Sequence, residues 1–234
     1  MDENIENPEK FWEDLYAGRA ARPLDSGPNA VLAAIMTGLG LPAGDALDLG
    51  CAEGADAVWL GQLGWNVTGV DVSETALERA RARAEHAGLG GRIRTERHDL
   101  GGSFPTGHFD LVNAQYLQTP LTFPRARVLR QAAAAVRPGG LLLIVDHASV
   151  APWSWNRGLD AVFPTPRETL ATLDLHPGDW IEHRVEAATR QAIGPGGQRA
   201  TVTDNVMALH RRAHETGEAT RARGSHVVPR SRTH

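Results

Sequence analysis

A short glycine turn between two apolar segments constrains the fold of this chain more than any other feature. The first segment, Ala46–Leu49, is followed at once by Gly50 and then by Gly54. The second segment, Trp65–Asp71, ends in an acid. A buried strand, a tight glycine turn, a helix and a second strand ending in a carboxylate form the first half of a nucleotide-type binding crevice.

Strand-like and helix-like patterns alternate over residues 46–146, which favours a parallel sheet with helices on both faces. Strands are expected at 46–49, 65–71, 92–97, 109–114 and 141–146, and helices at 55–63, 75–87 and 127–136. Two later strand-like runs flank Gly194–Gly197, which predicts a hairpin. We therefore predict a Rossmann-like α/β fold with a seven-stranded, mostly parallel sheet and a C-terminal antiparallel β-hairpin.

The chain is expected to divide into three parts. We expect a helical lid or cap, a binding domain with an internal substrate-pocket segment, and a disordered tail, at residues 1–40, 41–210 (pocket segment 148–179) and 211–234. Aromatic residues within 11–16 recur at helical spacing, and Pro28 is expected to open a second helix that ends near Gly40. Thr75 and Glu78 are expected to form a capping box. The tail is polar and rich in arginine, which favours disorder.

Composition excludes several partners. The formal net charge is −4 and the isoelectric point is about 6.2, so the basic footprint of a nucleic-acid-binding protein is absent. No apolar run approaches the ~20 residues that cross a membrane. Cys51 is the single cysteine, so no intramolecular disulfide can form, and without a leader-like N-terminus we expect a cytoplasmic protein. The sequence leaves monomer and homodimer open.

The residues at the carboxyl ends of the strands predict a nucleoside ligand. Gly50 and Gly54 allow the backbone to approach a ligand closely. Asp71 is placed to accept hydrogen bonds from the two hydroxyls of a ribose, although it could instead cap the following helix. Asp99, at the end of the third strand, is placed to accept from an adenine amine, although it could also be a solvated loop acid.

Acids beside the glycines narrow the type of nucleotide. Asp48 and Glu53 would repel a diphosphate and would suit a ligand with a positive charge. Ala52 also interrupts the G-x-G-x-x-G pattern of dinucleotide sites, so a nicotinamide-dependent dehydrogenase is the weaker alternative. S-adenosylmethionine, which has a ribose, an adenine, a sulfonium and an ammonium, fits this set of residues.

Several motifs together resemble those of a known family. The chain resembles class I S-adenosylmethionine-dependent methyltransferases at Asp48–Gly54, Val70–Ser73, His98–Leu100, Phe109–Val112 and Arg137–Gly140. Phe11–Tyr16 and Gly54–Leu60 look like the thiopurine and tellurite-resistance branch, which acts on small molecules. The resemblance covers roughly residues 40–146, and Ala52 departs from it where the family usually has glycine. It implies methyl transfer to a nitrogen, oxygen or sulfur atom of a small molecule by in-line displacement, with S-adenosylhomocysteine as product.

The expected cofactor-binding residues come mainly from these motifs. They are Tyr16, Asp48, Gly50, Cys51, Gly54, Asp71, Val72, Asp99, Leu100 and Asn113. Cys51 is expected to be a small buried residue whose backbone N–H touches the cofactor, and not a nucleophile. Tyr16 is expected to close over the cofactor as part of the lid, or else to pack as part of a helix face.

His147 and Tyr116 are the expected catalytic residues, and Asn113, Gln115 and Asp146 are further candidates at the crevice edge. His147 follows a buried strand and can act as a general base near neutral pH, or be held by nearby backbone. No set of metal-binding carboxylates is found near it, so no metal is expected.

The aromatic segment around Trp153 suggests an apolar or aromatic acceptor, or else a helix that caps the core. The alternative function is an S-adenosylmethionine-binding protein that catalyses another reaction or serves as a binding module.

Overall fold

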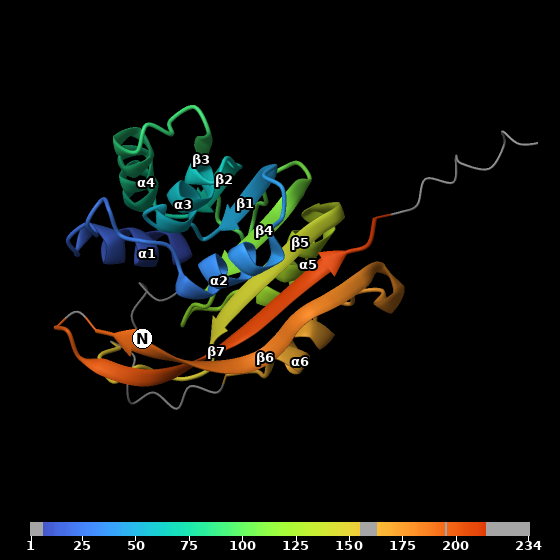
Figure 1. Cartoon of the computed structure of the whole chain (residues 1–234). Coiled ribbons are helices and arrows are strands. Elements are labelled where there is room, and N and C mark those ends of the chain that lie inside the picture. Colours follow the sequence, from blue (N-terminus) through green and yellow to red (C-terminus); the bar gives the residue numbers. More distant parts are fainter. Residues whose placement is uncertain (1–6, 155–162, 195, 214–234) are drawn as a thin grey trace, which may run out of the picture.

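One sheet organises the protein. The structure is a computed structural model that describes residues 7–154, 163–194 and 196–213 (Figure 1). The strands are β1 (Asp45–Leu49), β2 (Asn66–Asp71), β3 (Ile93–Arg97), β4 (Phe109–Gln115), β5 (Val136–His147), β6 (Trp180–Ile193) and β7 (Arg199–Arg211). Their order in the sheet is β3-β2-β1-β4-β5-β7-β6. The first five strands are parallel, and β7 pairs antiparallel with both β5 and β6. The predicted fold class, with its closing hairpin, is confirmed.

Helices cover both faces of this sheet. They are α1 (Pro8–Ala17), α2 (Ala30–Leu39), α3 (Ala55–Gln62), α4 (Glu74–His86), α5 (Arg125–Ala135) and α6 (Pro166–Ala171). The middle of β5 is apolar on both sides and fully buried, as its uniform sequence predicts. Leu142 and Ile144 pack in the same core cluster as α5, whereas Leu141, Leu143 and Val145 pack in the cluster of α2 and α3. Two apolar layers therefore hold the sheet from opposite sides.

Three local expectations differ from the structure. The capping box of Thr75 and Glu78 is wrong, because the hydroxyl of Ser73 accepts from the backbone N–H of Ala76 and caps α4. Pro28 does not open α2, since Asn29 is its N-cap residue. Residues 137–140 do not separate a helix from a strand, because β5 already begins at Val136 and runs through them with a shift of register.

The N-terminal helix α1 is anchored to α4. The carboxylate of Glu13 accepts hydrogen bonds from the hydroxyls of Ser73 and Thr75 and from the N–H of Thr75. The segment after α1 is held by the buried carboxylate of Glu53, which accepts from the N–H of Arg22 at 2.7 Å. These contacts keep α1 above the carboxyl ends of the strands. In the part of the chain that is described, no helix is long and apolar enough to cross a membrane.

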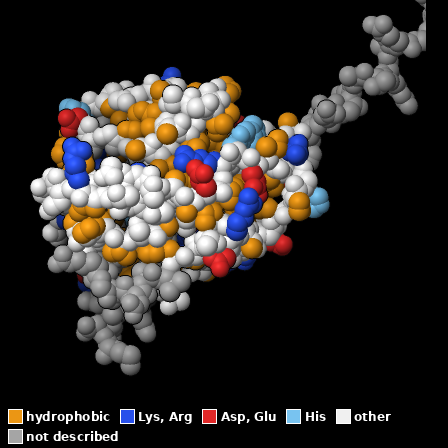
Figure 2. All heavy atoms as spheres, turned by 60° about the horizontal axis from the view of Figure 1, so that its bottom comes forward, with side chains coloured by type: hydrophobic (Ala, Val, Ile, Leu, Met, Phe, Trp, Pro, Cys, Tyr) orange, Lys and Arg blue, Asp and Glu red, His pale blue; other side chains and the backbone are white. Residues whose placement is uncertain are grey.

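The β6–β7 hairpin extends well beyond the parallel strands and runs along the bottom of the view in Figure 1. Its register places Asp204 of β7 opposite His147 at the end of β5. Its outer strand carries exposed ion pairs such as Arg184–Glu186, and Figure 2 shows basic and acidic side chains side by side on this face. The inner strand therefore brings C-terminal residues to the carboxyl edge of the sheet. The predicted tail lies outside the described residues from 214 onward.

Candidate functional site

The glycine turn after β1 has the backbone geometry that its sequence predicts. Gly50, Ala52 and Gly54 all have positive φ angles, of 69°, 51° and 75°. An alanine rarely adopts this conformation, and Ala52 is held in it by its N–H, which donates to the carboxylate of Asp71 at 3.0 Å. The turn and the end of β2 are therefore joined directly.

Two residues of the turn have roles other than the expected ones. The N–H of Cys51 donates to the carbonyl of Val70 at 2.9 Å, so it is already engaged within the protein, in contrast to the cofactor contact expected from the sequence. Gly54 lines none of the cavities described below. A side-chain carbon at Gly54 would lie 2.9 Å from the Cβ of Ala80, which shows that the glycine allows α3 to approach α4.

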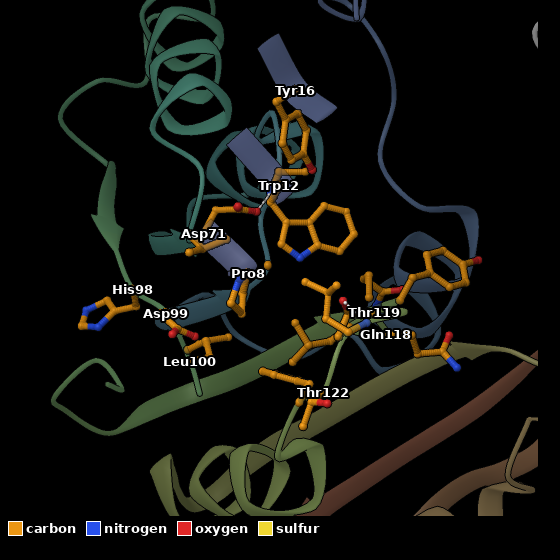
Figure 3. A pocket seen from close by; sticks show the side chains of 18 residues that line it. Pro8, Trp12, Tyr16, Asp71, His98, Asp99, Leu100, Gln118, Thr119 and Thr122 are labelled. Atoms are coloured by element: carbon orange, nitrogen blue, oxygen red, sulfur yellow. Dashed lines mark hydrogen bonds between the residues drawn. The ribbon is translucent and has the colours of Figure 1, made fainter. Parts of the chain in front are cut away.

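A cavity of about 280 Å³, the central cavity, lies above the carboxyl ends of β1, β2 and β3. It contains seven of the expected site residues, namely Tyr16, Gly50, Asp71, Val72, Asp99, Leu100 and Tyr116. In Figure 3, Trp12 and Tyr16 reach it from α1, while His98, Asp99 and Leu100 lie at one end. The structure therefore brings these seven residues together around one cavity, and other residues make up the rest of its lining.

Asp71 is buried at the edge of the central cavity. Its two carboxylate oxygens accept from the N–H groups of Ala52 and Ser73, each at 3.0 Å. Burial raises the pKa of Asp71, and these backbone N–H groups oppose that shift. Because Ser73 caps α4, the alternative role of Asp71 as the cap is not needed. Each oxygen still has a lone pair for a ligand hydroxyl.

The roof of the central cavity is aromatic. Tyr16 is buried, and the guanidinium of Arg19 lies 4.1 Å from the centre of its ring. Burial raises the pKa of Tyr16, so its hydroxyl stays neutral. Asp99 at the far end accepts from the N–H of Gly101 at 2.9 Å, which fixes its carboxylate beside the cavity.

A second space, the turn cavity, has a volume of about 340 Å³ and shares Gly50, Ala52, Gln115 and Tyr116 with the central cavity. Asp48 and Cys51 also line it. One oxygen of Asp48 accepts from the side chain of Asn113 at 2.8 Å, and the other is buried without a partner among the described residues. Burial raises the pKa of Asp48 to about 8, and Asp56 adds to the shift. A cationic group in the turn cavity would satisfy this oxygen.

Asn113 lies behind the turn cavity and does not line it. It is fully buried, donates to Asp48 and accepts from the side chain of Gln115 at 2.6 Å. It therefore orients two residues of the cavity wall, in contrast to the direct ligand contact expected from the sequence.

The third space, the hairpin cavity, is the largest at about 870 Å³. Its walls come from α1, the loop after β4, the end of β5, the pocket segment and the hairpin. Trp12, Trp153 and Phe163 give it an aromatic lining, and the last two belong to the segment 148–179 that is expected to shape a pocket. Of that segment, residues 155–162 lie outside the described residues.

Tyr116 lies where the three cavities meet, since it lines all of them. Its φ angle is 54°, and its N–H donates to the carbonyl of Val145 at 2.7 Å. Its hydroxyl donates to Asp204 at 3.0 Å and accepts from Arg190 at 3.1 Å. Its ring stacks on His147 with the ring centres 4.0 Å apart.

His147 borders the hairpin cavity. Desolvation lowers the pKa of His147, Arg190 contributes in the same direction, and Asp204 opposes it. The imidazole is therefore neutral near pH 7 and can accept a proton. Asp146 lies elsewhere, buried in an ion pair with Arg125 at 2.5 Å, so it does not reach the hairpin cavity.

Arg190 and Asp204 were missed by the sequence analysis. They form an ion pair at 2.5 Å between β6 and β7, and Asp204 is almost fully buried. A usable signal existed, because Asp204 is an acid in a strand whose residues from Val206 to Leu209 are all apolar. In native proteins a buried acid in such a strand is generally paired.

Residues 46–140 match the profile of a family described as "Methyltransferase domain". The chain is 33% identical over 144 residues to ribosomal RNA small subunit methyltransferase C of Alcanivorax borkumensis, which covers 56% of this chain and 41% of that protein. It is 34% identical over 144 residues to the 27-O-demethylrifamycin SV methyltransferase of Amycolatopsis mediterranei, covering 60% of this chain and 50% of that protein. The chain thus spans half or less of these relatives.

Solved structures share the fold. A structure described as "Conversion of a Disulfide Bond into a Thioacetal Group during Echinomycin Biosynthesis" has a TM-score of 0.67 and 23% identity, covering 90% of this chain and 94% of that one. TehB from Haemophilus influenzae has a TM-score of 0.63 and 19% identity, covering 86% and 66%. The [4+2]-cyclase SpnF has a TM-score of 0.60 and 16% identity, covering 86% and 92%.

Proposed function

We propose that residues 46–140, which match the family described as "Methyltransferase domain", form a class I S-adenosylmethionine-dependent methyltransferase domain, and that the protein transfers a methyl group from S-adenosylmethionine to a small-molecule acceptor. One observation supports this proposal above the others. The central and turn cavities share one wall, and together they offer acids where a nucleoside with a cationic tail needs them. The hairpin cavity opens beside them at Tyr116.

The residues of the first two cavities fit this cofactor. Asp71 has free lone pairs for two ribose hydroxyls, and Asp99 can accept from an adenine amine. The unpartnered oxygen of Asp48 can accept a hydrogen bond from the ammonium group. Bound there, S-adenosylmethionine supplies an activated methyl group on its sulfonium.

The protein's own contribution is alignment and exclusion of water. Trp12 and Tyr16 cover the central cavity, and Asn113 holds Asp48 in place. Tyr116 stands between the donor and acceptor spaces, so an acceptor in the hairpin cavity meets the methyl group beside its ring. Alignment of this kind supplies much of the acceleration of a displacement reaction. His147 is placed to remove a proton from the acceptor.

The net charge of the chain and the volume of the hairpin cavity both favour a small-molecule acceptor. The net charge of −4 does not favour the ribosomal RNA that one of the similar proteins is named for. A cavity of about 870 Å³ falls in the range of small-ligand sites. Another similar protein is named for a small molecule, rifamycin.

The alternative is a protein that binds the cofactor and catalyses another reaction. It stays open because the same fold occurs in a structure described as a [4+2]-cyclase. The fold itself therefore does not decide the chemistry.

Calorimetry with S-adenosylhomocysteine tests the binding step. Formation of S-adenosylhomocysteine from S-adenosylmethionine, measured with panels of candidate acceptors, tests the transfer. Binding without any product would favour the alternative. A thermal shift with a nicotinamide dinucleotide, but none with S-adenosylhomocysteine, would overturn the proposal.

A further inference from the structure

The charged groups of the hairpin cavity differ from those of the turn cavity. The turn cavity is lined by three acids, Asp48, Glu53 and Asp56, together with three arginines, Arg19, Arg22 and Arg190. In contrast, the described residues that line the hairpin cavity include no aspartate or glutamate, and Arg190 is their one residue with a permanent charge. The described lining of the hairpin cavity therefore offers the positive charge of Arg190 and no carboxylate that could pair with a cationic ligand.

Arg190 is held rigidly at this wall. Its Nε donates to the Oδ2 of Asp204 at 2.5 Å, and one of its terminal nitrogens, Nη2, donates to the hydroxyl of Tyr116 at 3.1 Å. The other, Nη1, forms no hydrogen bond with any described residue. Asp204 is buried and accepts from both Arg190 and the hydroxyl of Tyr116, so the three residues together fix the guanidinium plane. One donor edge of a fixed cation is thus left for a ligand.

A proton acceptor and flat walls lie in the same space. The imidazole of His147 is stacked on the ring of Tyr116 at an interplanar angle of 13°, so the two rings form a nearly parallel pair in the cavity wall. The indoles of Trp12 and Trp153 and the ring of Phe163 add further aromatic walls. The charged groups facing His147 are Arg190 and Asp204. Planar apolar ligands are suited to such walls.

We propose that the acceptor is a flat aromatic molecule with a weakly acidic hydroxyl, of the phenol or enol class, and that Arg190 determines this specificity by binding the oxygen as its negative charge develops. The inference rests on the proposed methyl transfer. It adds the class of the acceptor atom, an oxygen, and a residue that recognises it.

The proposed reaction transfers one proton and one methyl group. The acceptor hydroxyl gives its proton to His147, and the oxygen forms a bond to the methyl carbon. The bond from that carbon to sulfur breaks, and its electron pair stays on sulfur, which becomes a neutral thioether. His147 then releases the proton to solvent. Arg190 stays charged throughout and stabilises the oxygen before the new bond is complete.

An amine acceptor fits the hairpin cavity less well. A protonated amine would lie near Arg190 without a carboxylate among the described lining residues. Asp204 is almost fully buried and does not line the hairpin cavity; its Oδ2 accepts from Arg190 and Tyr116, and its Oδ1 is buried without a partner among the described residues. A cationic amine and the guanidinium of Arg190 would repel each other.

Binding of a matched pair of fluorescent probes tests the proposal without methyl transfer. Umbelliferone has the acidic hydroxyl, and the amino analogue of the same coumarin has the same shape without it. Titration by calorimetry, with S-adenosylhomocysteine present, gives both affinities. The excitation spectrum reports whether bound umbelliferone is the phenolate. We expect the hydroxyl probe to bind at least about tenfold more tightly, with its ionisation shifted toward the phenolate.

The variants Arg190→Gln and Arg184→Gln distinguish recognition of the acceptor oxygen by Arg190 from the effect of removing any positive charge from β6. Arg184 lies on the same strand in a surface ion pair with Glu186, so it is the matched control. We expect Arg190→Gln to remove the preference for the hydroxyl probe and the phenolate signal, and Arg184→Gln to retain both. Tyr116→Phe, which removes the hydrogen bond to Arg190 but keeps the stacked ring, is a second variant should Arg190→Gln fail to fold. It should weaken the phenolate signal.

Three outcomes would overturn the inference. They are equal binding of the two probes, tighter binding of the amine, and a loss of S-adenosylhomocysteine affinity in Arg190→Gln with probe affinity unchanged. The last result would assign Arg190 to the donor side, since it also lines the turn cavity. If the wild-type protein does not bind S-adenosylhomocysteine, the proposed function fails, whereas a phenolate preference measured without it would still support the class of ligand.

Discussion

The hydroxyl of Tyr116 donates to Oδ2 of Asp204 at 3.0 Å, although the two residues are 88 positions apart in the chain. This bond joins the loop after β4 to the C-terminal hairpin. Arg190 completes the set by bonding to both residues. The junction between the donor and acceptor spaces is therefore built from two distant parts of the sequence.

Substitution of Tyr116 by phenylalanine should slow methyl transfer by at least about tenfold, roughly 1.4 kcal/mol of activation free energy. The stacked ring is kept, but Arg190 loses a partner that holds its guanidinium. The affinity for S-adenosylhomocysteine should change less than about twofold. Initial rates and calorimetry on the same samples check this, and an unchanged rate would show that the hydroxyl is dispensable.

Asp71→Asn should weaken S-adenosylhomocysteine binding by at least about tenfold. The neutral amide gives weaker hydrogen bonds to ribose hydroxyls than the carboxylate, whose bonds are charge-assisted. Glu74→Gln is a matched control, because Glu74 is an exposed acid in the first turn of α4 that pairs with Arg81. Equal affinity of Asp71→Asn and wild type would remove Asp71 from the cofactor site. Thermal denaturation verifies that both variants are folded.

Asp48 predicts a specific dependence of stability on pH. Burial raises its pKa to about 8 in the folded protein from the ordinary value of 3.8. The folded state therefore holds a proton that the unfolded state loses, so this contribution to stability is complete below about pH 4 and declines as pH rises toward 8. Asp48→Asn should flatten this part of the stability profile, measured by thermal denaturation between these pH values without cofactor.

Asp48 should also release a proton when the cofactor binds. If a cationic ligand group meets Asp48, the carboxyl should release its proton when the ligand binds at neutral pH. Calorimetry of S-adenosylhomocysteine binding in buffers of different ionisation enthalpy measures this release. The wild-type protein should show it and Asp48→Asn should not. Identical values in both proteins would mean that Asp48 does not respond to the ligand.

Gly54→Ala should destabilise the protein by roughly 2–4 kcal/mol, since a methyl group there combines a left-handed backbone with overpacking. The added carbon would lie 2.9 Å from the Cβ of Ala80. Gly40→Ala is the control, because Gly40 has a positive φ of 57° but no atom within 4 Å of the added carbon. It should cost only roughly 1–2 kcal/mol. In urea denaturation, Ala80→Gly should restore part of the loss in Gly54→Ala and none in Gly40→Ala.

The parts of the structure that depend on local pattern were predictable. The apolar run of β5 and the turn after β1 specify the sheet and the position of Asp71 before any distant contact is considered. Thr75 was misassigned because a carboxylate from α1, that of Glu13, reaches it across 62 positions. Gly54 was read as a ligand residue because the sequence does not show that α4 passes behind it.

The hairpin residues were the least predictable. Strand periodicity indicated that β6 and β7 exist, but not which residues of them face the end of β5. Register decides that question, and the pairing of His147 with Asp204 follows from the whole length of the β5–β7 ladder. Arg190 could therefore not be assigned to a cavity from its neighbours in the sequence.

The insertion of β7 between β5 and β6 places the C-terminal hairpin at the edge of the sheet, away from the strands of the proposed donor site. The residues that line the donor spaces come chiefly from the first half of the chain, whereas the hairpin and the segment before it supply much of the acceptor wall. Mutations after β5 can therefore diversify the acceptor with little disturbance of the donor half. A chimera that takes its C-terminal third from another protein of this fold should take on the acceptor selectivity of that protein.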